Sequence, residues 1–322
     1  MADIAVAVTT YNQANWIGQT LESVLNQSLP PKEVVVVDDG STDDTPAVLD
    51  RFRDRVRVIR QRNTGVAGSR NAAVLACSAD YVALMDGDDL WHRDKLRRSA
   101  ELLAGSGEPS LLVHDLERIS PKGEVISGGE IAARLTTWKN GPVAVVNCVE
   151  HLILDNFIST TSQVVVRRTA YIDAGLSNPA FPIASDYDLY LRLATRGPFV
   201  FSGDVLTQWR RHDTSASGPA PEKQLESVID MATVLQAART RADMTSYVGT
   251  IDLRQNTLVR LIYSNETRCG KRTTARALVR LAWHTRNARG VIAAGAVLLT
   301  PQRLRRMLAS MTSVSISTQP GH

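Results

Sequence analysis

Two short apolar runs, each followed at once by aspartates, constrain the fold of this chain most strongly. The run Val34–Val37 leads into Asp-Asp at positions 38–39, and the run Tyr81–Met85 leads into Asp-Gly-Asp-Asp at positions 86–89. Apolar runs of this length are typical of strands that are buried on both faces of a sheet. Open α/β sheets bind their ligands at the carboxyl ends of the strands. The sequence therefore predicts two acidic clusters at the ligand-binding edge of an α/β sheet.

Strand-like and helix-like segments alternate from residue 4 to about residue 104. Strands are predicted at residues 4–8, 34–37, 56–59 and 81–85, with helices between them. This alternation predicts a Rossmann-like α/β fold in which a mostly parallel sheet is flanked by helices. The later segments are less regular, with strands predicted at residues 110–114, 163–166 and 199–202 and helices at 169–174 and 186–195.

A segment rich in Ser, Gly, Ala and Pro, residues 215–221, marks the predicted domain boundary. Residues 1–218 are predicted to form the sheet domain, and residues 219–322 a basic helical C-terminal region. Helices are expected there near residues 222–240, 251–264, 272–288 and 301–312. The C-terminal region has a net charge of +9 and residues 1–218 have a net charge of −5, which together give the chain its net charge of +4.

The cluster at positions 86–89 has the chemistry of a metal site. Its three carboxylates repel one another unless a cation or hydrogen-bond donors compensate their charge. Carboxylate oxygens suit Mg²⁺ or Mn²⁺, which bind one or two carboxylates together with the phosphate oxygens of a substrate. The simpler alternative is an acidic turn before a helix, with Asp88 or Asp89 as the N-cap.

Other polar residues at the predicted strand ends have the properties needed to hold a nucleotide. Tyr11 could stack on a base, Asp39 could accept a hydrogen bond from a base N–H or a ribose hydroxyl, and Arg70 could pair with phosphate. Each has a simpler explanation, as a packed ring, a turn residue and a cation on a helix surface respectively. Their positions on successive strand ends favour a common site.

Four segments of the chain resemble, in order and spacing, the motif set of the family 2 glycosyltransferases. These segments are residues 9–12, 37–43, 63–71 and 86–89. Members of that family are inverting, nucleotide-sugar-dependent enzymes with the GT-A fold. The resemblance is dense over residues 4–100 and becomes thinner towards residue 217.

The resemblance implies a role for each matching residue. The nucleotide would be held by Thr9, Tyr11, Asp39 and Arg70. Asp86 would contact the ribose side of the donor, and Asp88 would bind the Mg²⁺ or Mn²⁺ that bridges the diphosphate.

The same comparison identifies Asp186 as the catalytic base, at the start of the helix predicted over residues 186–195. Ser185 stands where family members often have Glu, so a supporting carboxylate is missing. The reaction needs one carboxylate to take a proton from the acceptor hydroxyl as it attacks the anomeric carbon. Asp188 is the alternative base, and an ordinary N-cap is the structural alternative for Asp186.

The sequence Arg-Arg-His at positions 210–212 resembles the basic, His-containing loop that closes over the diphosphate in this family. The resemblance gives Arg210 a contact with the nucleotide sugar and His212 a contact with the diphosphate or the metal. A single His in a loop is otherwise more often a surface residue.

These features predict an inverting glycosyltransferase that moves a single sugar, of the hexosyl kind, from a nucleotide diphosphate sugar to a hydroxyl acceptor. Bacterial-type cell-surface glycan or glycolipid synthesis is the expected setting, with a glycan, a lipid-linked molecule or a small molecule as acceptor and no nucleic-acid partner. The alternatives are a nucleotide-sugar-binding protein without turnover, favoured by Ser185, and an Asp-x-Asp phosphatase. A sugar-1-phosphate nucleotidyltransferase would need a Gly-rich loop after the first strand, where residues 9–12 differ.

The C-terminal region adds an expectation about location. Its longest apolar run, Val291–Leu299, is far shorter than the roughly 20 residues that span a bilayer. We therefore expect a cytoplasmic enzyme. Arginines at positions 276, 280, 303, 305 and 306 flank this run, which predicts a peripheral contact of the basic tail with the anionic inner face of the membrane.

Overall fold

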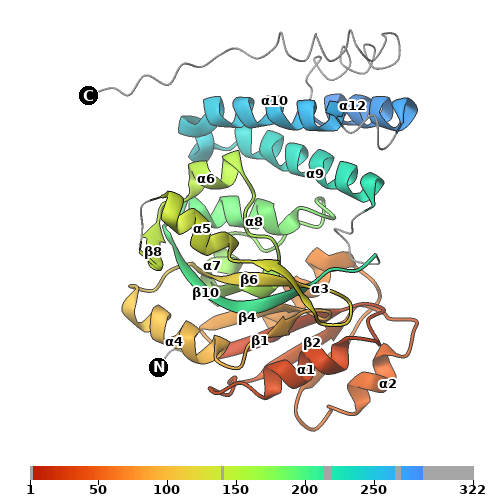
Figure 1. The fold of residues 1–322 in the computed structure, drawn as a ribbon, viewed down its shortest axis with the longest axis vertical. Helices are drawn as coiled ribbons and strands as arrows, with labels where there is room; N and C mark the ends of the chain where they lie inside the picture. Colours follow the sequence, from red (N-terminus) through yellow and green to blue (C-terminus); the bar gives the residue numbers. More distant parts are fainter. Residues whose placement is uncertain (1–2, 139–140, 214–219, 265–269, 286–322) are drawn as a thin grey trace.

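A computed structural model describes residues 3–138, 141–213, 220–264 and 270–285 (Figure 1). The N-terminal elements follow the predicted alternation of strands and helices. They are β1 (Ile4–Thr10), α1 (Ile17–Leu25), β2 (Val34–Asp38), α2 (Thr45–Asp50), β3 (Arg57–Arg60), α3 (Gly65–Ala76) and β4 (Tyr81–Asp86). The strands lie in the order β3-β2-β1-β4, and each neighbouring pair is parallel. The predicted parallel sheet is confirmed for these four strands.

The register of these strands brings their polar ends together. Thr9 pairs with Val37 on one side and with Asp86 on the other, and Thr10 pairs with Asp38. Because parallel strands end at the same edge of a sheet, the two acidic clusters lie along one edge, as the sequence predicted.

Beyond β4 the sheet is mixed. Its elements are β5 (Leu90–Trp91), α4 (Lys95–Gly105), β6 (Leu111–Ile119), β7 (Val125–Gly128), α5 (Glu130–Thr137), β8 (Val143–Val146), α6 (Val149–Leu154), the 3₁₀ helix η1 (Thr161–Gln163), β9 (Val164–Arg167), α7 (Arg168–Asp173), α8 (Ser185–Ala194) and β10 (Phe199–Arg210). β9 lies antiparallel between β4 and β6, and β10 is parallel to β6. The carboxyl ends of β6 and β10 therefore reach the same edge as those of β1 and β4.

Helices cover both faces of the sheet, and alternate residues of each strand pack under them. In β1, Val6 belongs to the hydrophobic cluster that contains Leu21 of α1, whereas Ala7 belongs to the cluster that contains Val74 of α3 and Tyr187 of α8. All five side chains are buried. Burial on both faces explains why the strands are continuous apolar runs in the sequence.

The C-terminal helices form a further layer over α6 and α8 (Figure 1). They are α9 (Pro221–Arg239), the 3₁₀ helix η2 (Ala242–Tyr247), α10 (Val248–Ser264) and α12 (Lys271–Thr285). Ile229, Leu258 and Leu278 belong to the same hydrophobic cluster as Tyr187 of α8. Within residues 220–264 and 270–285 the C-terminal region contains these helices, and its core continues into the sheet domain. The helix predicted at 301–312 lies outside the described residues.

Within the described residues of the chain, no helix has both the length and the apolar composition required to cross a bilayer.

Candidate active site

The sheet edge that carries Asp38–Asp39 and Asp86–Asp89 is called the acidic edge below. The ends of β1 and β4 approach each other closely there. The backbone N–H of Gly87 donates to the carbonyl oxygen of Thr9 at 2.9 Å. A Cβ atom at Gly87 would lie 2.9 Å from the side chain of Thr10, so this approach requires glycine. Tyr11 follows directly and is 46% exposed, which leaves its ring accessible at the edge.

Asp39 organises the loop that leads into α3. Its Oδ1 accepts hydrogen bonds from the side chain of Gln61 at 2.7 Å and from the backbone N–H of Thr64 at 2.9 Å, and its Oδ2 accepts from the N–H of Gly65 at 2.9 Å. The carboxylate is buried and holds the start of α3 beside the end of β2. The predicted contact of Asp39 with a base or ribose stays a prediction.

Arg70 of α3 reaches the tip of β4 and lies 3.5 Å from Oδ1 of Asp86. Its guanidinium also donates to Thr161 Oγ1 at 3.2 Å, and that hydroxyl lies 3.0 Å from both Asp86 oxygens. Burial opposes the charge of Arg70, but the carboxylates of Asp86 and Asp186 outweigh this effect and its pKa is raised. The two ends of the site, β4 and α8, are therefore electrostatically linked through Arg70.

Asp89 is the structural member of the acidic cluster. It is buried, and it accepts hydrogen bonds from the backbone N–H of Arg210 at 2.9 Å and from Thr160 Oγ1 at 3.0 Å. Burial, followed by the nearby charges of Asp88 and Asp86, raises the pKa of Asp89 well above its usual range. Its contacts attach the end of β10 to the acidic edge.

Asp88 and His212 form a pair at the same edge of the sheet. His212 Nε2 lies 2.9 Å from Asp88 Oδ2, and both side chains are largely buried. The imidazole stacks on Trp16 with a centroid separation of 4.1 Å, which fixes the plane of its ring. The sequence left open whether His212 would be a surface residue, and the structure places it beside the acidic cluster.

This pair fits a divalent cation. One carboxylate and one imidazole are suitable ligands for Mn²⁺, and the carboxylate also suits Mg²⁺. Among the described residues, no group of three or more His, Cys, Asp or Glu side chains could hold a metal ion. The remaining coordination positions would therefore go to water or to the phosphate oxygens of a substrate, as is usual for Mg²⁺.

The side chain of Arg210 points into the interior of the protein. It is one of the largest fully buried side chains, and its guanidinium donates to the carbonyl oxygens of Asp88 and Pro121, each at 2.9 Å, and to Gln19 Oε1 at 3.1 Å. These contacts hold the backbone of Asp88 in place. The predicted contact of Arg210 with the nucleotide sugar remains untested, whereas its support of the acidic cluster is visible.

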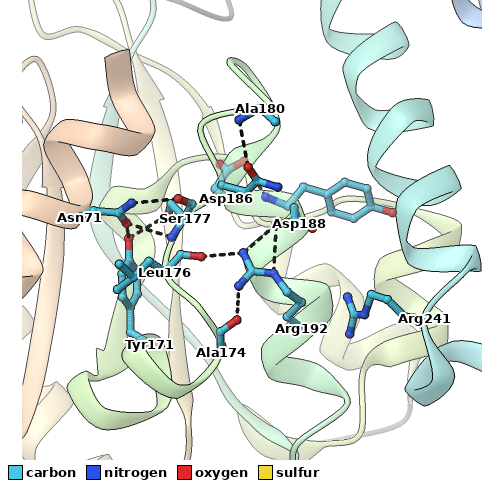
Figure 2. A network of polar contacts seen from close by, with 12 residues as sticks. Asn71, Tyr171, Ala174, Leu176, Ser177, Ala180, Asp186, Asp188, Arg192 and Arg241 are labelled. Carbon is cyan, nitrogen blue, oxygen red and sulfur yellow. Dashed lines mark hydrogen bonds and ion pairs between the residues drawn. The ribbon is translucent and has the colours of Figure 1, made fainter. Parts of the chain in front are cut away.

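The two candidate bases of α8 have different surroundings (Figure 2). Asp188 is buried, and its Oδ2 accepts from Arg192 Nε at 3.0 Å and from Nη2 at 2.6 Å. Arg192 in turn donates to the carbonyl oxygens of Ala174 and Leu176. Asp188 therefore belongs to a structural ion pair that ties α8 to the loop after α7.

Asp186 faces the site. Its Oδ1 accepts from the backbone N–H of Tyr187 at 2.7 Å. Burial is the largest influence on its pKa and raises it, Arg70 lowers it, and Asp86 raises it. The structure thus brings Asp186 into electrostatic contact with Arg70 and Asp86, although these three residues come from α8, α3 and β4.

Sequence reasoning missed the hydroxyl cluster at η1. The hydroxyls of Thr160 and Thr161 contact the Asp86 carboxylate, and Ser162 Oγ accepts the backbone N–H of Asp86 at 3.0 Å. A usable signal was present, because Thr160 and Gln163 have capping-box spacing and do form that motif. What the spacing does not reveal is that the motif lies beside the end of β4.

The fold, with acidic clusters at the carboxyl edge of its sheet, defines an α/β domain of the GT-A type. The structure is similar to that of S. aureus TarS residues 1–349 in complex with UDP, with a TM-score of 0.63 over 96% of this chain and 87% of that chain, at 18% identity. Residues 5–110 match the family described as Glycosyl transferase family 2. The N-terminal third of the chain is therefore similar to that family, and the likeness to TarS extends over the fold.

Curated relatives cover different stretches of the chain. Chondroitin synthase of Escherichia coli is 29% identical over 61% of this chain. The putative teichuronic acid biosynthesis glycosyltransferase TuaG of Bacillus subtilis is 38% identical over 31% of this chain. The succinoglycan biosynthesis protein ExoO of Rhizobium meliloti is 40% identical over 38% of this chain. The aligned stretches are 27%, 41% and 35% of the lengths of these relatives.

Proposed function

We propose that this protein is an inverting glycosyltransferase that moves a single sugar, of the hexosyl kind, from a nucleotide diphosphate sugar to a hydroxyl acceptor. The observation that carries the proposal is the position of Asp186, which faces Arg70 and Asp86 at the carboxyl edge of the sheet. A single displacement needs a base on the acceptor side of the donor, and a carboxylate at the start of α8 meets that need.

The strand ends would bind the donor. Tyr11 is exposed and available to stack on the base, with Thr9 and Asp39 beside it. Asp86 would meet the ribose side of the donor, and Arg70 would counter the charge of the nucleotide and of Asp86. The polar contacts of Asp39 and Arg70 would keep these groups in place before the donor arrives.

Asp88 and His212 would hold a Mg²⁺ or Mn²⁺ ion, with Arg210 fixing the backbone of Asp88. A bound ion supplies charge compensation for the leaving diphosphate. Asp186, in its ionised form, would accept the proton of the attacking hydroxyl. Arg70 favours that ionised form, since it lowers the pKa of Asp186 against the effect of burial.

The names of the relatives suggest the setting of the reaction. They refer to chondroitin, teichuronic acid and succinoglycan, which indicates cell-surface or secreted polysaccharides. We extend this to the present chain as synthesis of a surface glycan or glycolipid on the cytoplasmic side of the membrane. The helix α12 would lie near the lipid, because it contains four Lys or Arg residues and no Asp or Glu.

A donor screen tests the proposal. The full chain is incubated with a panel of nucleotide sugars and Mn²⁺ or Mg²⁺, and the released nucleoside diphosphate is measured. Release from one donor, accelerated by an acceptor and giving a product of inverted anomeric configuration, is expected. Release of inorganic phosphate instead would indicate the Asp-x-Asp phosphatase. Tight donor binding with no release would indicate a binding protein without turnover.

A further inference from the structure

Tyr190 carries a buried hydroxyl that packing alone does not explain. Its side chain is fully buried, and its Oη is among the buried polar atoms of the described residues that have no hydrogen-bond partner. Buried polar groups are normally hydrogen-bonded. A phenylalanine would fill the same space without burying an unpaired hydroxyl. The presence of tyrosine therefore suggests that the hydroxyl has a hydrogen-bond partner in another arrangement of the neighbouring side chains.

The position of Tyr190 in α8 indicates that partner. Tyr190 follows Asp186 by four residues, and residues with this spacing are neighbours on one face of a helix. Among the described residues, the Asp186 carboxylate accepts from backbone N–H groups, including that of Tyr187 at Oδ1, and no side chain is seen to donate to it. The second carboxylate oxygen, Oδ2, can therefore accept a hydrogen bond from the Tyr190 hydroxyl after a rotation of the Asp186 side chain.

The other groups around Tyr190 already have partners. The charged and titratable groups that face its hydroxyl are Asp186, Arg70 of α3, Asp86 of β4 and Tyr171 of α7. Arg70 and Asp86 are bonded to Thr161, and the Tyr171 hydroxyl contacts Asn71 at 2.7 Å and Ser177 at 2.8 Å (Figure 2). Burial and then Asp186 raise the pKa of Tyr190 well above its usual range, so its hydroxyl keeps its proton and acts as a donor.

We propose that Tyr190 is a positioning residue for the catalytic base, and that its hydroxyl donates a hydrogen bond to the carboxylate of Asp186 when that carboxylate is ionised. This inference rests on the proposed function. A hydrogen bond to an ionised acceptor is stronger than one to a neutral group, so the contact favours the form of Asp186 that accepts a proton. It also fixes the second oxygen of the carboxylate and gives the base a support that Ser185 does not supply.

Tyr190→Phe tests the contact, with Tyr81→Phe as the matched control. Tyr81 also has a buried hydroxyl without a partner, but it lies at the opposite end of β4 from Asp86. Loss of a hydrogen bond to the ionised form raises the pKa of a carboxyl. In Tyr190→Phe the acid limb of kcat should therefore move upward by about one pH unit. Turnover should fall about tenfold on the acid side and approach that of the unmodified protein at higher pH, with an unchanged KM for the donor.

A second measurement separates this inference from the proposed function. The carboxyl ¹³C signal of Asp186, assigned by its loss in Asp186→Asn, is titrated in the unmodified protein and in both Tyr variants. A raised pKa in Tyr190→Phe alone supports the contact even if no donor is turned over, in which case only the proposed function fails. An unchanged pKa, or an equal loss of turnover at every pH, or the same shift in Tyr81→Phe, would overturn the inference.

Discussion

Asp186 and Asp188 lie two residues apart in the first turn of α8, yet their carboxylates have different environments. Asp186 is influenced by Arg70 and Asp86 of the acidic edge, whereas Asp188 is bonded twice by Arg192. The sequence left open which of the two would be the base. Asp186 is the better candidate, because a base whose carboxylate is held by two hydrogen bonds from a guanidinium would have to break that ion pair to act.

Asp186→Asn should lower turnover by about 10² to 10⁴, which is the usual contribution of general-base catalysis. Donor affinity should be nearly unchanged, since Asp186 lies on the acceptor side of the proposed site. Single-turnover transfer and donor titration measure the two quantities. Near-normal turnover in this variant would rule out Asp186 as the base.

Asp188→Asn should act on stability instead. It weakens the hydrogen bonds from Arg192 and should lower the free energy of unfolding by about 1.5–3 kcal/mol, as expected for bonds between charged groups. Turnover per folded molecule should stay near that of the unmodified protein. Denaturant unfolding and activity of the folded fraction provide the test. A large loss of turnover without a loss of stability would instead assign the base to Asp188.

A divalent cation should strengthen the binding of a nucleoside diphosphate through Asp88 and His212. Calorimetric titration with nucleoside diphosphates should show tighter binding in Mn²⁺ than in excess chelator. Asp88→Ala should abolish the metal-dependent binding and the transfer but leave the fold intact, and His212→Ala should weaken both. Asp44→Ala, which removes an exposed aspartate of the preceding acidic segment, is the control. Equal binding and full activity in chelator would contradict this assignment.

At the scale of elements, α8 is held in place by the C-terminal region. The N-cap of α8 is Ala184, which has no side-chain oxygen to accept from the free N–H groups. Asp230 of α9 accepts from the N–H of Ile183 at 2.8 Å and from that of Ala184 at 2.7 Å. The turn before the proposed base is therefore fixed by a carboxylate from another helix.

Asp230→Ala should lower the free energy of unfolding by about 1.5–3 kcal/mol, because it removes two hydrogen bonds to a charged acceptor. It should also lower kcat more than it raises the KM of the donor, since it loosens the turn that carries Asp186. Asp230→Asn keeps an acceptor oxygen and should recover some of both losses. Glu226→Ala, one turn earlier at an exposed position of α9, is the control. Unchanged stability and kcat in Asp230→Ala would show that α8 is positioned without α9.

Local pattern was enough to predict β1, β2 and β4, because burial on both faces leaves a continuous apolar run. It was not enough for the second half of β6 or β10, where Glu117 and Gln208 are half-buried and paired with each other across the strands. The antiparallel direction of β9 also has no local signature. The burial of Arg210 depends on Gln19 and Pro121, which are distant in the sequence, so no spacing rule could predict it.

At the scale of the whole molecule, the basic C-terminal region should bring the protein to anionic lipid. In α12, Arg276 and Val279 are exposed, and each basic residue at such a surface contributes about 1 kcal/mol. The other members of the predicted membrane contact, the run Val291–Leu299 and the arginines at positions 303, 305 and 306, lie outside the described residues.

The full chain should co-sediment with phosphatidylserine vesicles at low salt and dissociate as salt is added. Arg276→Glu should weaken binding at least about fivefold. Arg239→Glu is the control, because Arg239 is paired with Asp252 in the native protein. Equal binding to zwitterionic vesicles, or none to anionic ones, would mean that the C-terminal region serves only as a helical cover.

The bonds that join β10 to the acidic edge connect residues far apart in the chain. Asp88 and His212 are separated by 124 positions, and Asp89 and Arg210 by 121. A ribosome adds about 5–20 residues each second, so roughly 6–25 s pass between the synthesis of Asp88 and Asp89 and that of their partners in and after β10. During most of that interval the nascent chain already contains residues 5–110 but lacks His212. A newly made molecule therefore completes the pair proposed to hold the metal only after His212 has been synthesised.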